Sequence, residues 1–184
     1  MHEDFMLKLV KDVIQTWVKT KKPIVVGEYP EELNKERGVF ISIYKTTGGF
    51  KHLRSTVGHA FPTKSVIRAL VDYSIMSCKD ASFTYLKPED LDGIQIKISI
   101  AGEPELIDIR SPRDYLSRIQ IGKDGLVLRK GIMTGDILPE IPVGNSWDVE
   151  KYLKHLCVKT GLASNAWTNL SAKIYKFDTE TFSE

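Results

Sequence analysis

One arginine stands in the middle of a predicted strand, where a cation is uncommon. Arg54 belongs to the run His52-Leu-Arg-Ser-Thr-Val-Gly58, which is rich in residues that favour β-structure. A guanidinium in a cleft can hold a carboxylate or a phosphate through parallel hydrogen bonds. A structural arginine would instead pair with a nearby acid or face the solvent. The residue type therefore indicates either an anion anchor or a structural contact.

Further polar candidates fall in segments without strong periodicity. Lys123, Asp124 and Glu140 are expected in loops, where functional side chains are common and solvated charges are commoner still. Asp124 or Glu140 could serve as a general acid or base if an anion were held beside them. Trp147 could anchor a protein partner, although packing at a helix end is an equally ordinary role.

Several chemistries lack their sequence signatures. The four histidines do not stand at the spacings from other ligand residues that are typical of zinc or calcium sites. The nucleophile elbow Gly-x-Ser-x-Gly does not occur either. We therefore expect neither a metal nor a cofactor. The glycine-rich segments 122–125 and 131–135 are not phosphate-binding loops, and we interpret both as turns between antiparallel strands. Cys78 and Cys157 each end an amphipathic helix pattern, which predicts buried free thiols.

The bulk composition is that of an ordinary globular chain. It has 184 residues, 42% hydrophobic side chains and a net charge of +2. No apolar run approaches the ~18 residues of a membrane span, and charges interrupt the N-terminal segment at every turn. We therefore expect a cytoplasmic protein without membrane contact. The mild positive charge makes nucleic acid an unlikely partner, because no nucleic-acid-binding module accompanies it.

The periodicity of apolar residues predicts an α+β fold. Helices are expected over 4–18, after Pro62 up to Ser77, from Ser111 to Arg118 and over 147–160. Strands are expected over 38–45, 52–58, 94–100 and 172–177, with a mixture of strand and turn over 119–144. The first two strands should form a hairpin, and strict alternation would place Arg54 and Thr56 on one face of the second strand and Ser55 on the other.

Short motifs spread over about 140 residues resemble one family. The chain is similar to the AMMECR-type domain, and its archaeal members look closest. The matching pieces, in order, are Gly38-Val-Phe-Ile-Ser, Leu53-Arg54, Gly58, Asp80, Phe83, the strand 94–100, Pro104-Glu-Leu-Ile107, Gly122-Lys-Asp-Gly-Leu126, Leu138-Pro139, Trp147-Asp148, Cys157-x-Lys-x-Gly-Leu162, Trp167 and Ile174-Tyr-Lys-Phe177.

The resemblance implies a single domain, residues 1–184, of two intimately packed lobes. Each lobe would hold an antiparallel sheet flanked by helices, with a cleft between the lobes. The family has no established biochemical activity. In some relatives the domain accompanies a radical-SAM enzyme and a Memo-like protein, which hints at a shared pathway.

This chain departs from the family at its signature strand. The usual Leu-Arg-Gly-Cys-Ile-Gly reads here Leu53-Arg-Ser-Thr-Val-Gly58, so Ser55 replaces a glycine and Thr56 a cysteine. The family segment Arg-Phe-Pro-Pro has become Ser82-Phe-Thr-Tyr85. If the family cysteine is a nucleophile or a metal ligand, this chain has lost that function, because a threonine hydroxyl without a strong base is a far poorer nucleophile. If the cysteine only packs, Thr56 is a tolerable replacement.

Two functions follow as hypotheses. The first is a binding or adaptor module that holds a protein segment or a small anionic ligand in the cleft, with Arg54, Thr56, Lys123 and Trp147 among its contacts. The second is an enzyme, a hydrolase or transferase acting on a nucleotide or modified small molecule, with Asp124 or Glu140 as acid or base and Arg54 as the anion clamp.

Overall fold

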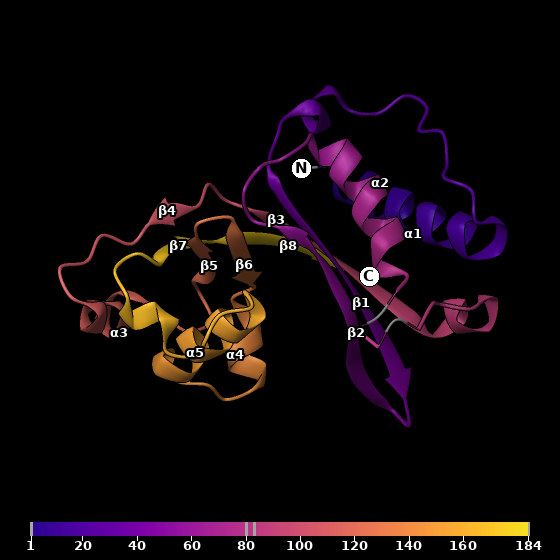
Figure 1. The fold of residues 1–184 in the computed structure, drawn as a ribbon. Helices are drawn as coiled ribbons and strands as arrows, with labels where there is room; N and C mark the ends of the chain where they lie inside the picture. The colour runs from indigo at the N-terminus through magenta and orange to yellow at the C-terminus, as the bar shows by residue number, and fades with distance from the viewer. Residues whose placement is uncertain (1, 80, 83, 184) are drawn as a thin grey trace. The chain divides into compact units, whose positions relative to one another are not determined.

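The chain forms two compact units, each built around its own antiparallel sheet (Figure 1). The computed structural model describes residues 2–79, 81–82 and 84–183. The first unit comprises residues 1–100 and 180–184, and the second comprises residues 101–179. The α+β class and the two antiparallel sheets agree with the sequence-based expectation. The intimate packing of the lobes and the cleft between them stay predictions.

Two amphipathic helices pack against the sheet of the first unit, and their bounds are α1 (Glu3–Thr20) and α2 (Val66–Ser77). The apolar stripe of α1 repeats every three to four residues and is almost wholly buried, which explains why this segment forms a helix. Lys21 ends α1 in a left-handed conformation, with φ of 58°, and its N–H donates to the Trp17 carbonyl.

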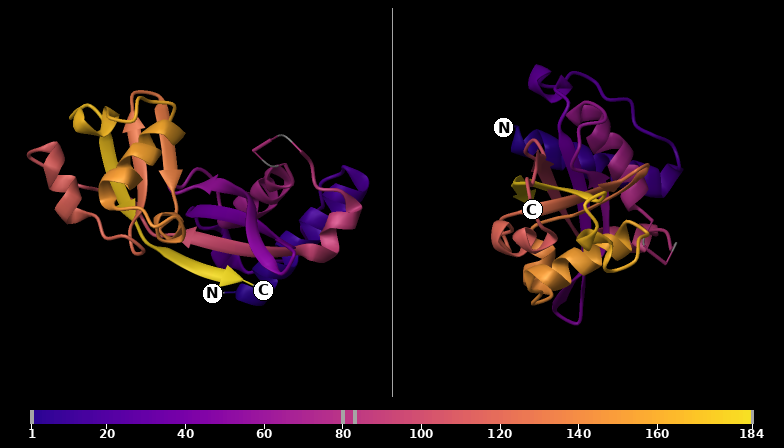
Figure 2. Two further views of the ribbon diagram at one scale, coloured as in Figure 1. Left: turned by 90° about the horizontal axis from the view of Figure 1, so that it is seen from below. Right: turned by 60° about the vertical axis from the view of Figure 1, so that its left-hand side comes forward.

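The first sheet has the strand order β2-β1-β3-β8. Its strands are β1 (Gly38–Thr47), β2 (Phe50–His59), β3 (Ile94–Ala101) and β8 (Thr179–Ser183). Alternate isoleucines of β1 and β3 join the helices in one hydrophobic core. The C-terminal strand β8, yellow in Figure 2, is the edge strand beside β3. The chain therefore returns to the first unit at its end.

The hairpin β1–β2 contains an irregularity at the residue of greatest interest. Ile43 pairs with Ser55 and Tyr44 pairs with Leu53, so Arg54 is the extra residue of a β-bulge. A bulge re-aims side chains relative to strict alternation. The expectation that Arg54 and Ser55 lie on opposite faces was therefore wrong. Both side chains instead reach carbonyl groups at the C-terminal end of α2.

The second sheet has the order β4-β7-β5-β6. Its strands are β4 (Glu105–Leu106), β5 (Gly125–Lys130), β6 (Met133–Ile137) and β7 (Lys173–Phe177). The α-helices of this unit are α3 (Tyr115–Arg118), α4 (Glu140–Gly144) and α5 (Val149–Lys159). The buried stripe of α5, with Asp148 as its N-cap, contributes to a separate hydrophobic core.

Short 3-10 turns complete the connections. They are η1 (Glu31–Asn34), η2 (Pro88–Gly93), η3 (Pro112–Asp114) and η4 (Ala166–Thr168). In η3 the Ser111 hydroxyl and the Asp114 carboxylate accept main-chain N–H groups at the start of the turn.

Several predicted boundaries need correction. Glu140 does not lie in a loop but begins the short helix α4, which is too brief for periodicity to reveal. The 122–125 segment joins α3 to β5 rather than two strands, whereas the turn at Gly131 does join β5 and β6. The strands β4 and β8 were missed. Asp80 and Phe83, two of the family matches, lie outside the described residues.

Candidate functional site

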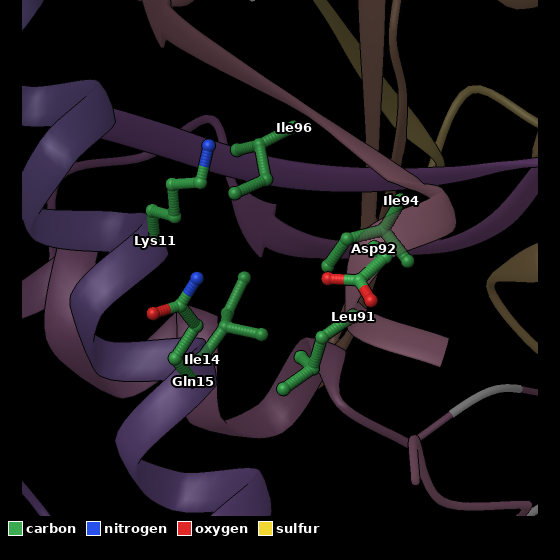
Figure 3. Close-up of a pocket in the computed structure, with 7 residues that line it drawn as sticks. All are labelled: Lys11, Ile14, Gln15, Leu91, Asp92, Ile94 and Ile96. Carbon is green, nitrogen blue, oxygen red and sulfur yellow. The ribbon is translucent and has the colours of Figure 1, made fainter. Parts of the chain in front are cut away.

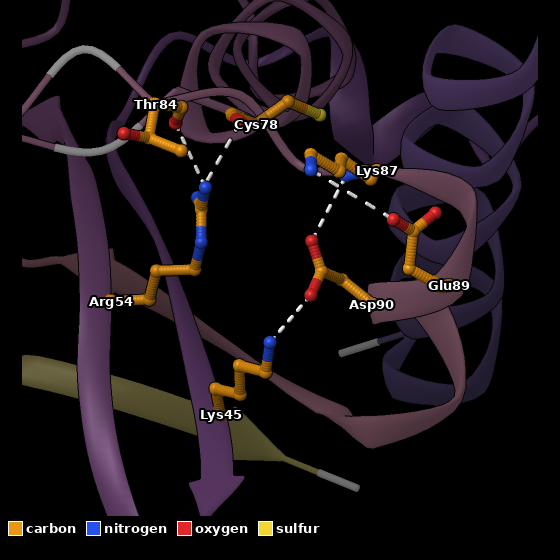
Figure 4. Close-up of polar contacts among 7 residues, drawn as sticks. All are labelled: Lys45, Arg54, Cys78, Thr84, Lys87, Glu89 and Asp90. Carbon is orange, nitrogen blue, oxygen red and sulfur yellow. Dashed lines mark hydrogen bonds and ion pairs between the residues drawn. The ribbon is translucent and has the colours of Figure 1, made fainter.

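Arg54 fastens the connection that follows α2 (Figure 4). One guanidinium nitrogen, Nη2, donates to the Thr84 carbonyl oxygen at 2.8 Å, and Nη1 lies 3.4 Å from the Cys78 carbonyl oxygen. The Leu86 N–H donates to the same Cys78 carbonyl at 2.7 Å. The guanidinium therefore holds main-chain carbonyl groups at both ends of the segment 78–84. The sequence had suggested an acid partner or the solvent for a structural arginine, and had not suggested main-chain carbonyls.

The two altered positions of the signature strand are engaged in hydrogen bonds. The Ser55 hydroxyl, which is buried, donates to the Ser77 carbonyl at 2.7 Å. The Thr56 hydroxyl lies 2.9 Å from the Ser42 hydroxyl, directly across the strand pair. The replacement of glycine by Ser55 thus adds a bond to the end of α2, and Thr56 forms a cross-strand polar pair.

Lys45, another cation of the β1–β2 hairpin, forms an ion pair with the turn η2. The Lys45 ammonium binds the Asp90 carboxylate at 2.5 Å, and the other carboxylate oxygen accepts the Lys87 N–H at 3.0 Å (Figure 4). The hydrogen bond from Lys45, followed by the one from the Lys87 N–H, lowers the pKa of Asp90. Arg54 and Lys45 therefore attach both halves of the segment 79–92 to the same hairpin.

The segment held in this way presents an aromatic ring between lysines. Tyr85 is 52% exposed. The Lys79 ammonium lies 5.5 Å from the centre of its ring, and the Lys21 ammonium, at the end of α1, lies 6.0 Å from it. We call these three residues the Tyr85 surface. The electron-rich ring face attracts the two ammonium groups, and these ammonium groups can in turn attract an anionic group.

Cys78 lies beneath this surface and is not placed for nucleophilic chemistry. The residue is 1% exposed, and its thiol lies 3.3 Å from the Ser74 carbonyl. Burial raises the pKa of the Cys78 thiol to about 11, although Lys21 and Arg54 act in the opposite direction. Cys157 is also buried and free, and burial raises its pKa as well. The prediction of two buried free thiols is confirmed.

In the second unit, Asp124 serves the turn before β5. Its carboxylate accepts the Gln120 N–H at 2.8 Å, and its carbonyl accepts a bond from the Tyr152 hydroxyl at 3.2 Å. The same hydroxyl lies 3.0 Å from the Ile137 carbonyl. Burial raises the pKa of Tyr152, and the nearby charges of Asp124 and Glu140 act in the same direction. These contacts link the turn before β5, the end of β6 and the helix α5 in one buried hydrogen-bond network.

The other candidates of this unit have separate surroundings. Lys123 is exposed, and Glu140 begins α4 half-buried. The Trp147 ring stacks on the His155 ring with centroids 3.9 Å apart and planes 4° from parallel. Trp147 therefore packs along α5, as the helix-end interpretation expected. Whether these side chains meet Arg54 in a cleft, as the enzyme hypothesis requires, stays a prediction.

Among residues 2–79, 81–82 and 84–183, no group of three or more histidine, cysteine or acidic side chains is placed to hold a metal ion. Within the same ranges, none of the helices combines the length and the apolar character needed to cross a bilayer.

Comparison with known proteins decides the family. The AMMECR1 family model matches residues 7–182. This chain belongs to the AMMECR1 family. Protein MJ0810 of Methanocaldococcus jannaschii is 39% identical over 181 residues, covering 98% of this chain and 89% of that protein. The crystal structure of the uncharacterised protein PH0010 of Pyrococcus horikoshii matches with a TM-score of 0.90 at 32% identity, covering 99% of this chain and 91% of that one.

The structure explains why several AMMECR1 motifs have their residue types. A side chain at Gly58 would place its Cβ 2.2 Å from the Val39 carbonyl oxygen, so only glycine allows this approach of β2 to β1. In the motif Cys157-x-Lys-x-Gly161, the cysteine packs in the core of the second unit, and the Lys159 ammonium donates to the Asp136 carbonyl at 2.6 Å. Gly161 follows α5 with φ of +81°, a left-handed conformation that favours glycine at the end of a helix. These motif positions build the fold.

Sequence reasoning did not find the Tyr85 surface. Lys21 follows the helix predicted over 4–18, and Lys79 and Tyr85 stand in a connection for which the sequence predicted no helix or strand. The three residues meet because Arg54 and Lys45 hold the connection in place, and no local pattern reports such a contact. The available signal was the departure of Thr84 and Tyr85 from the proline pair of the family.

Proposed function

We propose that this AMMECR1 protein is a binding module, and that the Tyr85 surface holds an acidic segment of a partner protein or a small anionic ligand. The observation that carries the proposal is the position of two ammonium groups within 6.0 Å of one half-exposed aromatic ring. The ring restricts where the lysine side chains lie, so less conformational entropy is lost when an anion binds between them.

Arg54 is a positioning residue in this proposal. Its bonds to the Thr84 and Cys78 carbonyls place Tyr85 and Lys79 beside the end of α1. The proposal thus keeps the anionic ligand of the binding hypothesis but moves the direct contact from Arg54 to Lys21 and Lys79. The protein would act in the cytoplasm, where free thiols such as Cys78 remain reduced.

The experiment is a titration of the isotope-labelled chain with a peptide of eight glutamates and, separately, with inorganic phosphate. Amide resonances of residues 21, 79 and 85 should shift in a saturable manner, and added salt should weaken binding. The double variant Lys21→Ala/Lys79→Ala should lose about tenfold in affinity, since two ion contacts each contribute roughly 0.5–1 kcal/mol at an exposed site.

The matched control is Lys8→Ala/Lys35→Ala, which removes the same two charges from exposed positions elsewhere in the first unit. If both double variants weaken binding equally, the interaction depends on net charge and the Tyr85 surface is not the site. Tyr85→Ala and Tyr85→Phe then separate the role of the ring from that of the hydroxyl, because only the first removes the aromatic face.

A further inference from the structure

A small cavity lies between α1, the turn η2 and the start of β3, all within the first unit (Figure 3). It has a volume of about 230 Å³. Pockets for drug-sized ligands usually exceed roughly 300 Å³, so this one suits a smaller molecule. None of its lining residues belongs to the Tyr85 surface, and the inference below stands independently of the function proposed above.

The inner walls of the cavity are aliphatic. Ile14 and Ile96 belong to the hydrophobic core of the first unit, with 0% and 2% of their surfaces exposed. Leu91 and Ile94 are half-buried and complete this lining from η2 and β3. Four branched aliphatic side chains therefore offer an apolar floor on which a small hydrocarbon group could lose contact with water.

The rim of the cavity carries opposite charges on opposite walls. Lys11 and Gln15 stand four residues apart on α1 and so share one face of the helix. Asp92 extends from η2 on the other side, and Figure 3 shows its carboxylate across the cavity from the side chains of Lys11 and Gln15. A ligand seated on the isoleucines would meet an ammonium and an amide on one side and a carboxylate on the other.

We propose that this cavity binds a small zwitterion with a branched aliphatic side chain, of the class of the apolar α-amino acids. The ligand carboxylate would accept hydrogen bonds from the Lys11 ammonium and the Gln15 amide, and its ammonium would donate to Asp92. The side chain would rest on Ile14 and Ile96. A ligand with only a negative charge would be repelled by the Asp92 carboxylate. A ligand with only a positive charge would be repelled by the Lys11 ammonium.

The wall that carries Asp92 is held in position before any ligand arrives. Asp90, two residues earlier in η2, binds the Lys45 ammonium and the Lys87 N–H. α1, the opposite wall, is anchored in the core along its length. A site between two fixed walls loses little entropy on binding, which favours a small ligand with few contacts of its own.

The test is a titration of the isotope-labelled full chain with L-leucine, followed through the amide resonances of residues 11–15 and 91–96. We expect saturable shifts confined to these segments. Lys11→Met and Asp92→Asn should each weaken leucine binding about tenfold, because each removes one charge-assisted hydrogen bond. Lys8→Met, an exposed lysine one turn earlier on α1, should leave the affinity unchanged.

Three further probes decide whether a zwitterion is the ligand class. Relative to leucine, 4-methylpentanoate lacks the ammonium, 3-methylbutylamine lacks the carboxylate and glycine lacks the aliphatic group, and each should bind at least about tenfold more weakly. Absence of shifts with leucine, or equal binding of either singly charged analogue, would overturn the proposal. The substituted residues lie at the rim, so unchanged resonance dispersion will verify that each variant is folded.

Discussion

Replacement of Arg54 by alanine should release the segment 78–86 without unfolding the rest of the chain. The guanidinium bonds to the Thr84 carbonyl at 2.8 Å, within the usual range for a strong N–H···O contact. Its 3.4 Å approach to the Cys78 carbonyl is longer than that range and adds little. The variant therefore loses at least this one hydrogen bond from a charged donor, and the magnitude worked out below is the contribution of that bond.

A hydrogen bond that involves a charged group contributes about 1.5–3 kcal/mol net, and the lower end applies because Thr84 is exposed. A loss of about 1.4 kcal/mol corresponds to a tenfold change in an equilibrium constant. The local opening equilibrium of this segment should therefore rise about tenfold in Arg54→Ala. The Leu86 amide, which donates to the Cys78 carbonyl at 2.7 Å, reports that opening directly.

Amide hydrogen exchange of the intact protein is the assay. The Leu86 amide should exchange about tenfold faster in Arg54→Ala, while the Leu126 amide of the second unit should be unaffected. Arg54→Lys keeps the charge but lacks the planar fork, so its exchange should be intermediate. Arg68→Ala, an exposed arginine of α2, serves as the matched control.

One combination of results would refute this reasoning. If Leu86 exchange is unchanged in Arg54→Ala while binding of the glutamate peptide is lost, Arg54 contacts the ligand itself. It would then be an anion anchor, and the positioning role argued from its two carbonyl contacts would be wrong.

Three other perturbations test the first unit. Gly58→Ala should cost about 3 kcal/mol in urea unfolding, because the new Cβ would lie 2.2 Å from a main-chain oxygen of β1; Gly27→Ala, with open space around it, should be neutral. The lowered pKa of Asp90 means that its bond with Lys45 stabilises the fold above the unfolded pKa of about 3.9 and is lost as pH falls through the lower folded value. The protection of the η2 amides, measured relative to their intrinsic exchange rates at each pH, should fall in acid, and Asp90→Asn should abolish that fall. Cys78, with its pKa raised to about 11, should be alkylated at pH 8 more than about 100-fold slower in the native protein than in urea.

The sequence predicted some features of the candidate site residues and missed others. Sequence reasoning identified Arg54 as unusual, because a charge inside a strand needs a partner, but the structural role that it considered was an acid partner or solvent exposure and not a contact with main-chain carbonyls. The bulge that turns Arg54 and Ser55 toward α2 depends on register with β1, which no pattern within β2 specifies. Glu140 was misplaced because one helical turn carries too few apolar positions to show a period.

The sequence by itself determined the α+β class, the long helices, the isoleucine strand β3, the two buried thiols and the family. The class, the helices, the strand and the thiols follow from burial of one face of a single element, and that constraint is written locally as a period of 3.6 or 2. The family follows from the order of short motifs along the chain. Beyond the β1–β2 hairpin, only the tertiary structure decided which strands pair, that β8 returns to the first sheet, and that Lys21 meets Tyr85. Such contacts join residues far apart in the chain, and their free energy depends on the geometry of both partners at once.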